Sequence, residues 1–125
     1  MSPLGSSWVL AVSDIKRGEI YRVNWGTGKG SEQAGERPAL IIQNDIGNWA
    51  SPTTIIASLT TAPNKEYPFL VKFTKEESGL EQGGTVDLAA IMTIDKKRLI
   101  NDKCGQLDSK KMAEVDEAIK TSLGL

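Results

Sequence analysis

The sequence predicts a mainly β domain, a small and strongly curved barrel with one helix at its carboxyl end. Three observations lead to this fold class. Apolar residues alternate with polar ones, or form short continuous runs, through the middle of the chain. Clusters of glycine, proline and asparagine separate these runs. One stretch near the end of the chain has apolar residues at helical spacing instead.

Six segments are expected to form strands. Residues 19–25 alternate and place Tyr21, Val23 and Trp25 on one face. Residues 39–42 and 54–59 are continuous apolar runs, which are typical of strands buried on both faces. The other expected strands are 69–73, with Lys72 outward, 85–94, which is long enough to bend, and 103–107. Turn chemistry is expected between them at 26–35, 44–52 and 63–68.

One segment, 109–122, is expected to be a helix. Asp108 or Ser109 can cap its start, and Gly124 can end it. A single helical turn can also begin at Asp95 and run through 96–99. The apolar residues of the long helix recur at helical spacing and form a stripe that should face the core: Met112, Val115, Ile119 and Leu123.

Length and composition indicate a globular protein with a single core. The chain has 125 residues, of which 39% are hydrophobic and 25% are charged. No apolar run approaches the roughly 20 residues that a membrane span needs. The one cysteine, Cys104, excludes an internal disulfide and suits the reducing cytoplasm, where we expect the protein. Residues 1–14 lack the basic start of a signal peptide; we expect a disordered extension or an expression remnant there, and the domain at 15–125.

The chain has no histidine, which narrows the possible chemistry. A serine–histidine or cysteine–histidine arrangement is impossible, and a zinc site without histidine would need more than one cysteine. The acidic residues are scattered through loops and the last helix, so we expect no metal and no cofactor. The net charge of −1 provides no overall positive field for nucleic acid.

The most informative segment is 30–48, GSEQAGERPALIIQNDIGN. A polar, glycine-framed loop leads into Arg37, and an apolar strand follows. Functional groups concentrate where a loop meets a rigid strand. An arginine at such a place offers a planar fork that matches a phosphate or carboxylate group.

This segment resembles the MazF/PemK family of toxin–antitoxin endoribonucleases. The resemblance covers nearly everything after Ile15, in the order of the family. The other segments that resemble the family are KRGEIY at 16–21, SPTTIIASLT at 51–60, TIDKKRL at 93–99 and EVDEAI at 114–119. It implies an SH3-like barrel of the MazF, PemK and CcdB type. It also implies a homodimer that cleaves single-stranded mRNA and is neutralised by a MazE-like antitoxin.

The resemblance implies that Arg37 and Thr60 are the catalytic residues and lie together. RNA can be cut without metal or histidine because its own 2′-OH is the nucleophile. The protein then has to orient that group and stabilise charge on the phosphoryl oxygens. An arginine side chain releases its proton only with difficulty, which favours electrostatic stabilisation over proton transfer for Arg37. Taken alone, an arginine before a proline is usually a surface cation, and a threonine that closes a strand is usually structural.

Further RNA contacts are expected from two loops. Ser31, Glu32 and Gln33 form the loop that lies over RNA in similar toxins, although a solvated turn is an equal alternative. Asn44 and Asn48 either contact RNA or satisfy the backbone of their turn, and we favour the second role. Trp25 and Trp49 can stack on bases, but packing is the commoner use of tryptophan.

One departure from the family leaves a second function open. The MazF subgroup carries Glu-Gln and then Arg where this chain has Ala89, Ala90 and, after Ile91, Met92. The catalytic Arg and Asp of the PemK type are also absent, because Asp87 and Ala89 stand at the matching positions. We therefore expect an altered recognition sequence. The alternative is a non-catalytic module that sequesters antitoxin or poisons another target such as gyrase.

Overall fold

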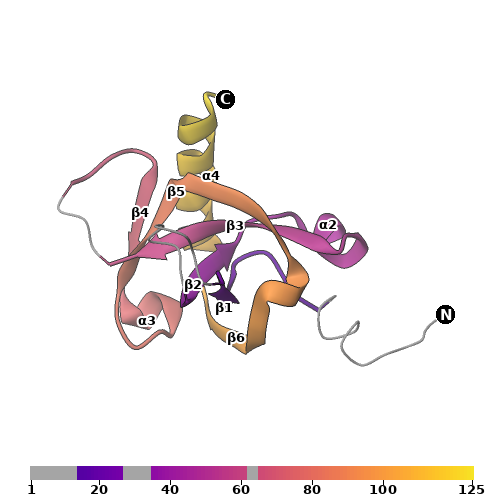
Figure 1. Ribbon diagram of the computed structural model, residues 1–125. Helices are drawn as coiled ribbons and strands as arrows, with labels where there is room; N and C mark the ends of the chain where they lie inside the picture. Colours follow the sequence, from indigo (N-terminus) through magenta and orange to yellow (C-terminus); the bar gives the residue numbers. More distant parts are fainter. Residues whose placement is uncertain (1–13, 27–34, 62–64) are drawn as a thin grey trace.

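The computed structural model describes residues 14–26, 35–61 and 65–125. Within these ranges it contains six strands, three α-helices and one 3-10 turn (Figure 1). The strands are β1 (Glu19–Asn24), β2 (Glu36–Ile41), β3 (Thr53–Thr60), β4 (Leu70–Phe73), β5 (Gly84–Asp95) and β6 (Leu99–Gln106). The helical elements are α2 (Asp45–Ala50), α3 (Lys75–Ser78), η1 (Lys96–Arg98) and α4 (Ser109–Leu123). None of the helices in the described ranges is long and apolar enough to cross a membrane.

The strands form one antiparallel sheet in the order β4-β5-β3-β2-β1-β6. Two register shifts bend it. Residues 88–90 of β5 have no partner in β3, because they lie between the pairs Ala57–Ile91 and Ser58–Asp87. Residues 101–104 of β6 face only Tyr21 of β1. Because extra residues on one strand bend and twist it, the sheet curves strongly, and β5 arches across it in Figure 1. The predicted mainly β fold with a curved sheet and a terminal helix is confirmed.

Both faces of the central strands are buried, as the continuous apolar runs predicted. Leu40 and Ala57 belong to a cluster on one face, which α4 covers with Met112 and Val115. The residues between them on the strands form the cluster of the opposite face, which contains Tyr21, Val23, Ala39, Ile41, Ile56 and Ile94. The centre of the sheet is therefore fixed from two sides, and the ends of its strands are available for a site.

The long helix begins and ends where the sequence predicts. The Asp108 carboxylate accepts a hydrogen bond from the Lys111 main-chain N–H at 2.9 Å. Gly124 closes the helix in the left-handed conformation, with φ of 75°. The predicted stripe is wrong at Leu123, which is 59% exposed, whereas Ala118 is buried. In the same last turn, the Ser122 hydroxyl donates to the Leu88 carbonyl of β5 at 2.6 Å, so the turn contacts the sheet through a polar side chain and not through Leu123.

Two short helices, α2 and α3, were not predicted from the sequence. The first lies within residues 44–52, which were expected to form a turn. Asn44 caps α2, because its side-chain oxygen accepts from the Gly47 N–H at 2.8 Å. Thr74 caps α3 through a reciprocal capping box with Glu77. Helices of one turn depend on such caps and on tertiary contacts, and they show no apolar periodicity. The last strand was also predicted too short, since β6 begins at Leu99.

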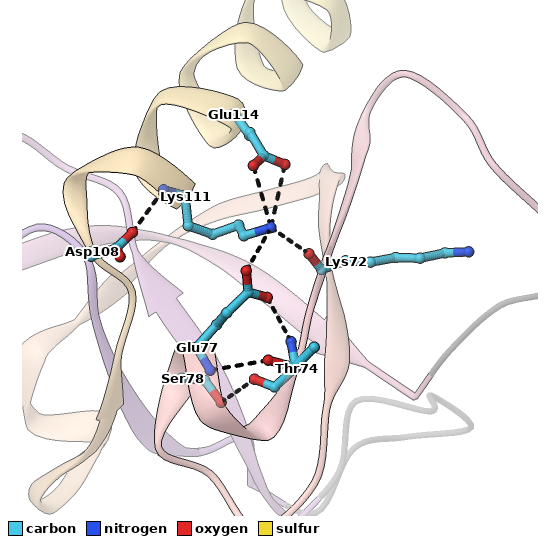
Figure 2. A network of polar contacts seen from close by, with 7 residues as sticks. All are labelled: Lys72, Thr74, Glu77, Ser78, Asp108, Lys111 and Glu114. Atoms are coloured by element: carbon cyan, nitrogen blue, oxygen red, sulfur yellow. Dashed lines mark hydrogen bonds and ion pairs between the residues drawn. The ribbon is translucent and has the colours of Figure 1, made fainter.

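A polar network joins α3 to α4 and β4 (Figure 2). The Lys111 ammonium lies 3.3 Å from carboxylate oxygens of both Glu77 and Glu114. It also donates to the main-chain carbonyl of Lys72 at 3.1 Å. Burial disfavours the charge of Lys111, but the two carboxylates outweigh it and raise its pKa. The network holds α3, and with it the segment that follows α3, at a fixed place beside the sheet.

Candidate active site

Arg37 and Thr60 lie on neighbouring strands at one end of the sheet. Strands β2 and β3 pair in the register Ala39–Ser58, Leu40–Ala57 and Ile41–Ile56. Continuing this register by two residues places Arg37 opposite Thr60. The alternation of side chains then puts both on the same face, because directly opposed residues share a face. The pairing of β2 with β3 thus brings the two residues to the same end of the sheet.

Both residues line one pocket of about 720 Å³. It lies at the rim where β2 begins, β3 ends and β5 begins. Pro38, Leu59 and Phe73 supply apolar surface, and the segment between α3 and β5 forms one wall. The full lining consists of Arg22, Arg37, Pro38, Leu59, Thr60, Thr61, Phe73, Gly79, Leu80, Glu81, Gln82, Gly83, Gly84 and Cys104.

The start of β2 is fixed beside the end of β1. The main-chain N–H of Trp25 donates to the Gly35 carbonyl at 2.9 Å, and the N–H of Gly35 donates to the Gly26 carbonyl at 3.0 Å. Gly35 has φ of 77°, a left-handed conformation that suits glycine. These bonds close the loop two residues before Arg37. Arg37 therefore leaves a rigid piece of backbone and is half-buried.

Two arginines, Arg22 and Arg37, are among the residues that line the pocket. Arg22 of β1 is held by Glu36: its Nη2 donates to the main-chain carbonyl at 3.2 Å, and its Nε lies 3.8 Å from the carboxylate. Arg37 follows Glu36 directly along β2. The hydroxyl of Thr60 donates to the Thr61 carbonyl at 3.3 Å, a long bond that is easily exchanged for a ligand. Two cations and a hydroxyl suit an anionic group such as a phosphate.

Cys104 lines the same pocket as a neutral group. Its thiol donates to the Ile20 carbonyl at 3.5 Å, and burial raises its pKa, partly opposed by Arg22. A thiol with a raised pKa is a poor nucleophile at neutral pH. Cys104 is half-buried in β6.

The other predicted site residues do not meet at this pocket. Ser31, Glu32 and Gln33 lie outside the described residues. Asn44 is exposed and caps α2. Asn48 is fully buried; its amide donates to the Gln43 carbonyl at 2.9 Å and accepts from the Thr54 hydroxyl at 2.7 Å. This burial leaves Asn48 no surface for RNA and fits the structural role that we favoured for it.

The two described tryptophans differ in environment. Trp25 packs half-buried against the second apolar cluster, and its indole N–H is buried without a hydrogen-bond partner among the described residues. Trp49 is 72% exposed on α2. Neither lines the pocket. Within residues 14–26, 35–61 and 65–125, no group of three or more cysteine, aspartate or glutamate side chains is arranged to hold a metal.

Comparison with known proteins decides the family. A sequence model of the PemK-like, MazF-like toxins of type II toxin–antitoxin systems matches residues 16–123. The chain belongs to this toxin family. Endoribonuclease EndoA of Bacillus subtilis is 45% identical over 112 residues, which are 89% of this chain and 96% of that protein. Endoribonuclease MazF of Staphylococcus epidermidis is also 45% identical over 112 residues, 89% of this chain and 92% of the relative.

Solved structures agree with this assignment. A mycobacterial endoribonuclease in complex with its cognate antitoxin has a TM-score of 0.73 and 27% identity, over 89% of this chain and 96% of that one. A MazE–MazF complex from Deinococcus radiodurans also has a TM-score of 0.73, over 89% and 97% of the two chains. At 22% identity, the second likeness bears on the fold alone.

The departure of this toxin from the MazF pattern falls at the bend of β5. Ala89 and Ala90 belong to the unpaired residues that bend the strand, and Met92 is 41% exposed opposite Ile56. Asp87 uses a carboxylate oxygen to accept from the Ala89 N–H at 2.9 Å. At this bend Ala89 is exposed and Ala90 is half-buried.

Three pocket residues were missed by sequence reasoning: Arg22, Glu81 and Gln82. The alternation in β1 indicated that Arg22 points away from Tyr21 and Val23, but not that it reaches the start of β2. Glu81 and Gln82 follow a short helix without periodicity, so nothing local placed them beside Thr60.

Proposed function

We propose that this toxin is a metal-independent endoribonuclease that cleaves single-stranded mRNA at a preferred sequence. The observation that carries this proposal is the pairing of β2 with β3, which brings Arg37 and Thr60 to one pocket. The endoribonucleases EndoA and MazF, at 45% identity, support the same reaction class. We do not retain the non-catalytic alternative, because the pocket has the cations and the hydroxyl that the reaction needs.

The proposed reaction uses the 2′-OH of the RNA as nucleophile. Its oxygen forms a bond to the adjacent phosphorus while the bond from phosphorus to the 5′ oxygen breaks. The 2′ proton is released, and the departing 5′ oxygen gains a proton. Arg37 and the Thr60 hydroxyl stabilise the charge that grows on the phosphoryl oxygens, and Arg22 adds a second positive charge nearby. The products are a 2′,3′-cyclic phosphate and a 5′-OH.

Positive charge at the pocket can attract RNA, although the chain as a whole carries a small negative charge. The net charge is −1, so attraction of RNA has to be local. Arg22 and Arg37 supply two positive charges to the lining of the pocket, and Glu81, between α3 and β5, is the one carboxylate among its lining residues. A phosphate is therefore attracted to the β1–β2 side of the pocket.

The toxin is proposed to act in the cytoplasm, where mRNA is available, and to be neutralised by a MazE-like antitoxin. The mycobacterial endoribonuclease at 27% identity was solved with its cognate antitoxin, which supports a partner of this class. We keep Ser31, Glu32 and Gln33 as proposed RNA contacts on the strength of the family resemblance alone.

We also propose that the toxin is a homodimer, with α2 at the interface. Ile46 and Trp49 on this helix are 81% and 72% exposed. Two large apolar side chains exposed on one short helix form a patch that a second copy can cover. The helix itself is anchored to the body of the protein through buried Asn48, so it presents both side chains on a firm support.

The proposed reaction is tested with purified protein, a long RNA and EDTA. Cleavage should persist in EDTA, the mapped cuts should share a sequence, and the fragments should carry 5′-OH ends. A 2′-deoxy substitution at the nucleotide before the cut should block cleavage at that site. Activity that is lost in EDTA and restored by magnesium would overturn the metal-independent mechanism.

A further inference from the structure

One wall of the pocket is formed by Leu80, Glu81 and Gln82, between α3 and β5. The side chains of Glu81 and Gln82 are exposed and line the pocket. Neither has a hydrogen bond or an ion pair with any residue in the described ranges. The wall thus offers a carboxylate and an amide that no neighbour in the described part of the chain uses, in the lining of a pocket that Arg37 and Thr60 also line.

Two glycines bring this wall close to Thr60. A Cβ atom on Gly84 would lie 3.2 Å from the main-chain oxygen of Thr60 and 3.0 Å from the Phe73 ring. A Cβ atom on Gly83 would lie 2.8 Å from the Phe73 carbonyl oxygen. Only residues without side chains allow such an approach. The next residue, Thr85, pairs directly with Thr60 across the β3–β5 ladder.

The wall is also rigid before any ligand binds. The Leu80 N–H donates to the Ser78 hydroxyl at 3.1 Å, and this hydroxyl donates to the Thr74 carbonyl at 3.1 Å. The Leu80 side chain packs closely on Gly105 of β6, where a Cβ atom would lie 3.0 Å from a Leu80 methyl carbon. The Lys111 network of Figure 2 fixes α3 from the other side. A preorganised wall is what selective recognition requires, because little ordering remains to be done on binding.

We propose that this wall is a subsite for one nucleobase next to the scissile phosphate, and that it selects guanine. The inference rests on the proposed endoribonuclease function. Arg22 and Arg37, on β1 and β2, attract the phosphate, and Leu80, Glu81 and Gln82 line the same pocket, so a base attached to that nucleotide can reach them. Single-stranded RNA is commonly recognised by hydrogen bonds to such unstacked base edges.

The chemistry of the two side chains sets the preference. An ionised carboxylate only accepts hydrogen bonds, so Glu81 favours a base with two adjacent donors. Guanine has these donors at N1 and N2, and the Gln82 amide can donate to its O6. Uracil has one N–H donor between two carbonyl oxygens, which Glu81 repels. Leu80 supplies the apolar surface against which the base packs.

The subsite is tested by sequencing the cuts that the full-length wild type and Glu81→Gln make in a randomised RNA pool. Wild type should show guanine enriched at one fixed position near the cut. Glu81→Gln should reduce the discrimination between guanine and uracil at this position by roughly tenfold or more, since a good bidentate contact is worth about that much. Preferences at the other positions should not change. Glu76→Gln, the same change on exposed α3 outside this pocket, is the matched control.

Two negative outcomes are distinguishable. If wild type cleaves the pool but Glu81→Gln keeps the same preference at every position, the subsite is wrong and the nuclease function stands. If wild type cleaves nothing, the proposed function itself fails. In that case, binding of uncleavable 2′-deoxy oligonucleotides still tests the wall. Loss of the guanine-over-uracil affinity ratio in Glu81→Gln would support the subsite, and an unchanged ratio would overturn it.

Discussion

Lys96 donates a hydrogen bond from its ammonium group to the main-chain carbonyl of Asn48, although Lys96 is only 2% exposed. The bond joins η1, after the bent strand β5, to α2, the helix that carries Trp49. The Asn48 side chain extends the link, because it accepts from both Thr54 and Gln43. A buried polar connection of this kind holds α2 in one position against the sheet.

Lys96→Ala should destabilise the protein by roughly 1–3 kcal/mol, because it leaves the Asn48 carbonyl buried without its donor. Denaturant unfolding near neutral pH measures the loss. Lys110→Ala, an exposed lysine on α4, should change the free energy of unfolding by less than about 0.5 kcal/mol. Equal effects of the two substitutions would mean that the buried bond contributes nothing.

The same lysine should give the stability a particular pH dependence. Burial lowers the pKa of Lys96 from its ordinary value of 10.5. Between the lowered pKa and 10.5 the unfolded chain therefore binds more protons at this residue than the folded chain does. The free energy of unfolding should rise with pH in that window through this group. The deficit of Lys96→Ala relative to wild type should widen as the solution becomes more alkaline; a constant deficit would contradict this linkage.

A second pH effect is expected at the acidic end, from the network of Figure 2. The hydrogen bond from the Thr74 N–H, followed by the contact with Lys111, lowers the pKa of Glu77 below its ordinary value of 4.5. A carboxylate with a lowered folded pKa stabilises the protein above 4.5, and this stability is lost as pH falls through the folded pKa. Glu77→Gln should therefore flatten the acidic part of the stability profile, as measured by unfolding at a series of pH values. Glu76→Gln should leave that part unchanged.

The sequence was enough to predict those strands and helices that several local signals specify together. Residues 39–42 and 54–59 are apolar on both faces of a strand, and the structure buries them from both sides. The helix α4 has a cap, a stripe and a terminal glycine, each legible in the sequence. By contrast, α2 and α3 have single turns stabilised by Asn44 and Thr74. The only signal available for them was the capping-box spacing from Thr74 to Glu77.

The site was predictable only in part, for a physical reason. Arg37 and Thr60 meet through strand register, a long-range property that no local pattern encodes, and the family resemblance alone connected them. The proposed guanine subsite of Leu80, Glu81 and Gln82 depends on the close approach of Gly83 and Gly84 to Phe73 and Thr60. Such packing between distant segments is invisible along the chain, so Glu81 and Gln82 were not candidates.

Dimer formation should depend on α2. Trp49→Glu places a charge in the proposed apolar interface and should convert the dimer to a monomer at micromolar concentration, as light scattering would measure. The protomer should remain folded, because Trp49 is 72% exposed. Leu123→Glu, at a 59% exposed position on α4, should leave the dimer intact. Dimeric Trp49→Glu would place the interface elsewhere, and a monomeric wild type would remove the dimer altogether.

Arg37→Ala should abolish most of the RNA cleavage while the fold and the dimer persist. The fork of Arg37 is proposed to bind the phosphoryl oxygens more strongly as charge grows in the transition state. Loss of one such donor lowers the reaction rate by a factor of roughly 10²–10³ at comparable oxyanion sites. Arg37→Lys should recover only part of the rate, since lysine retains the charge but not the two-pronged geometry. Single-turnover cleavage of one RNA measures these effects.

Thr60→Ala and the double variant test whether the two residues act on one group. Thr60→Ala should also slow cleavage, by loss of a hydroxyl that lines the same pocket as Arg37. If both residues stabilise the same phosphoryl group, the double variant should lose less than the sum of the two single losses in activation free energy. Strictly additive losses would show that they act independently. A wild-type rate in Arg37→Ala, with the dimer intact, would remove Arg37 from the mechanism and return the pocket to a binding role.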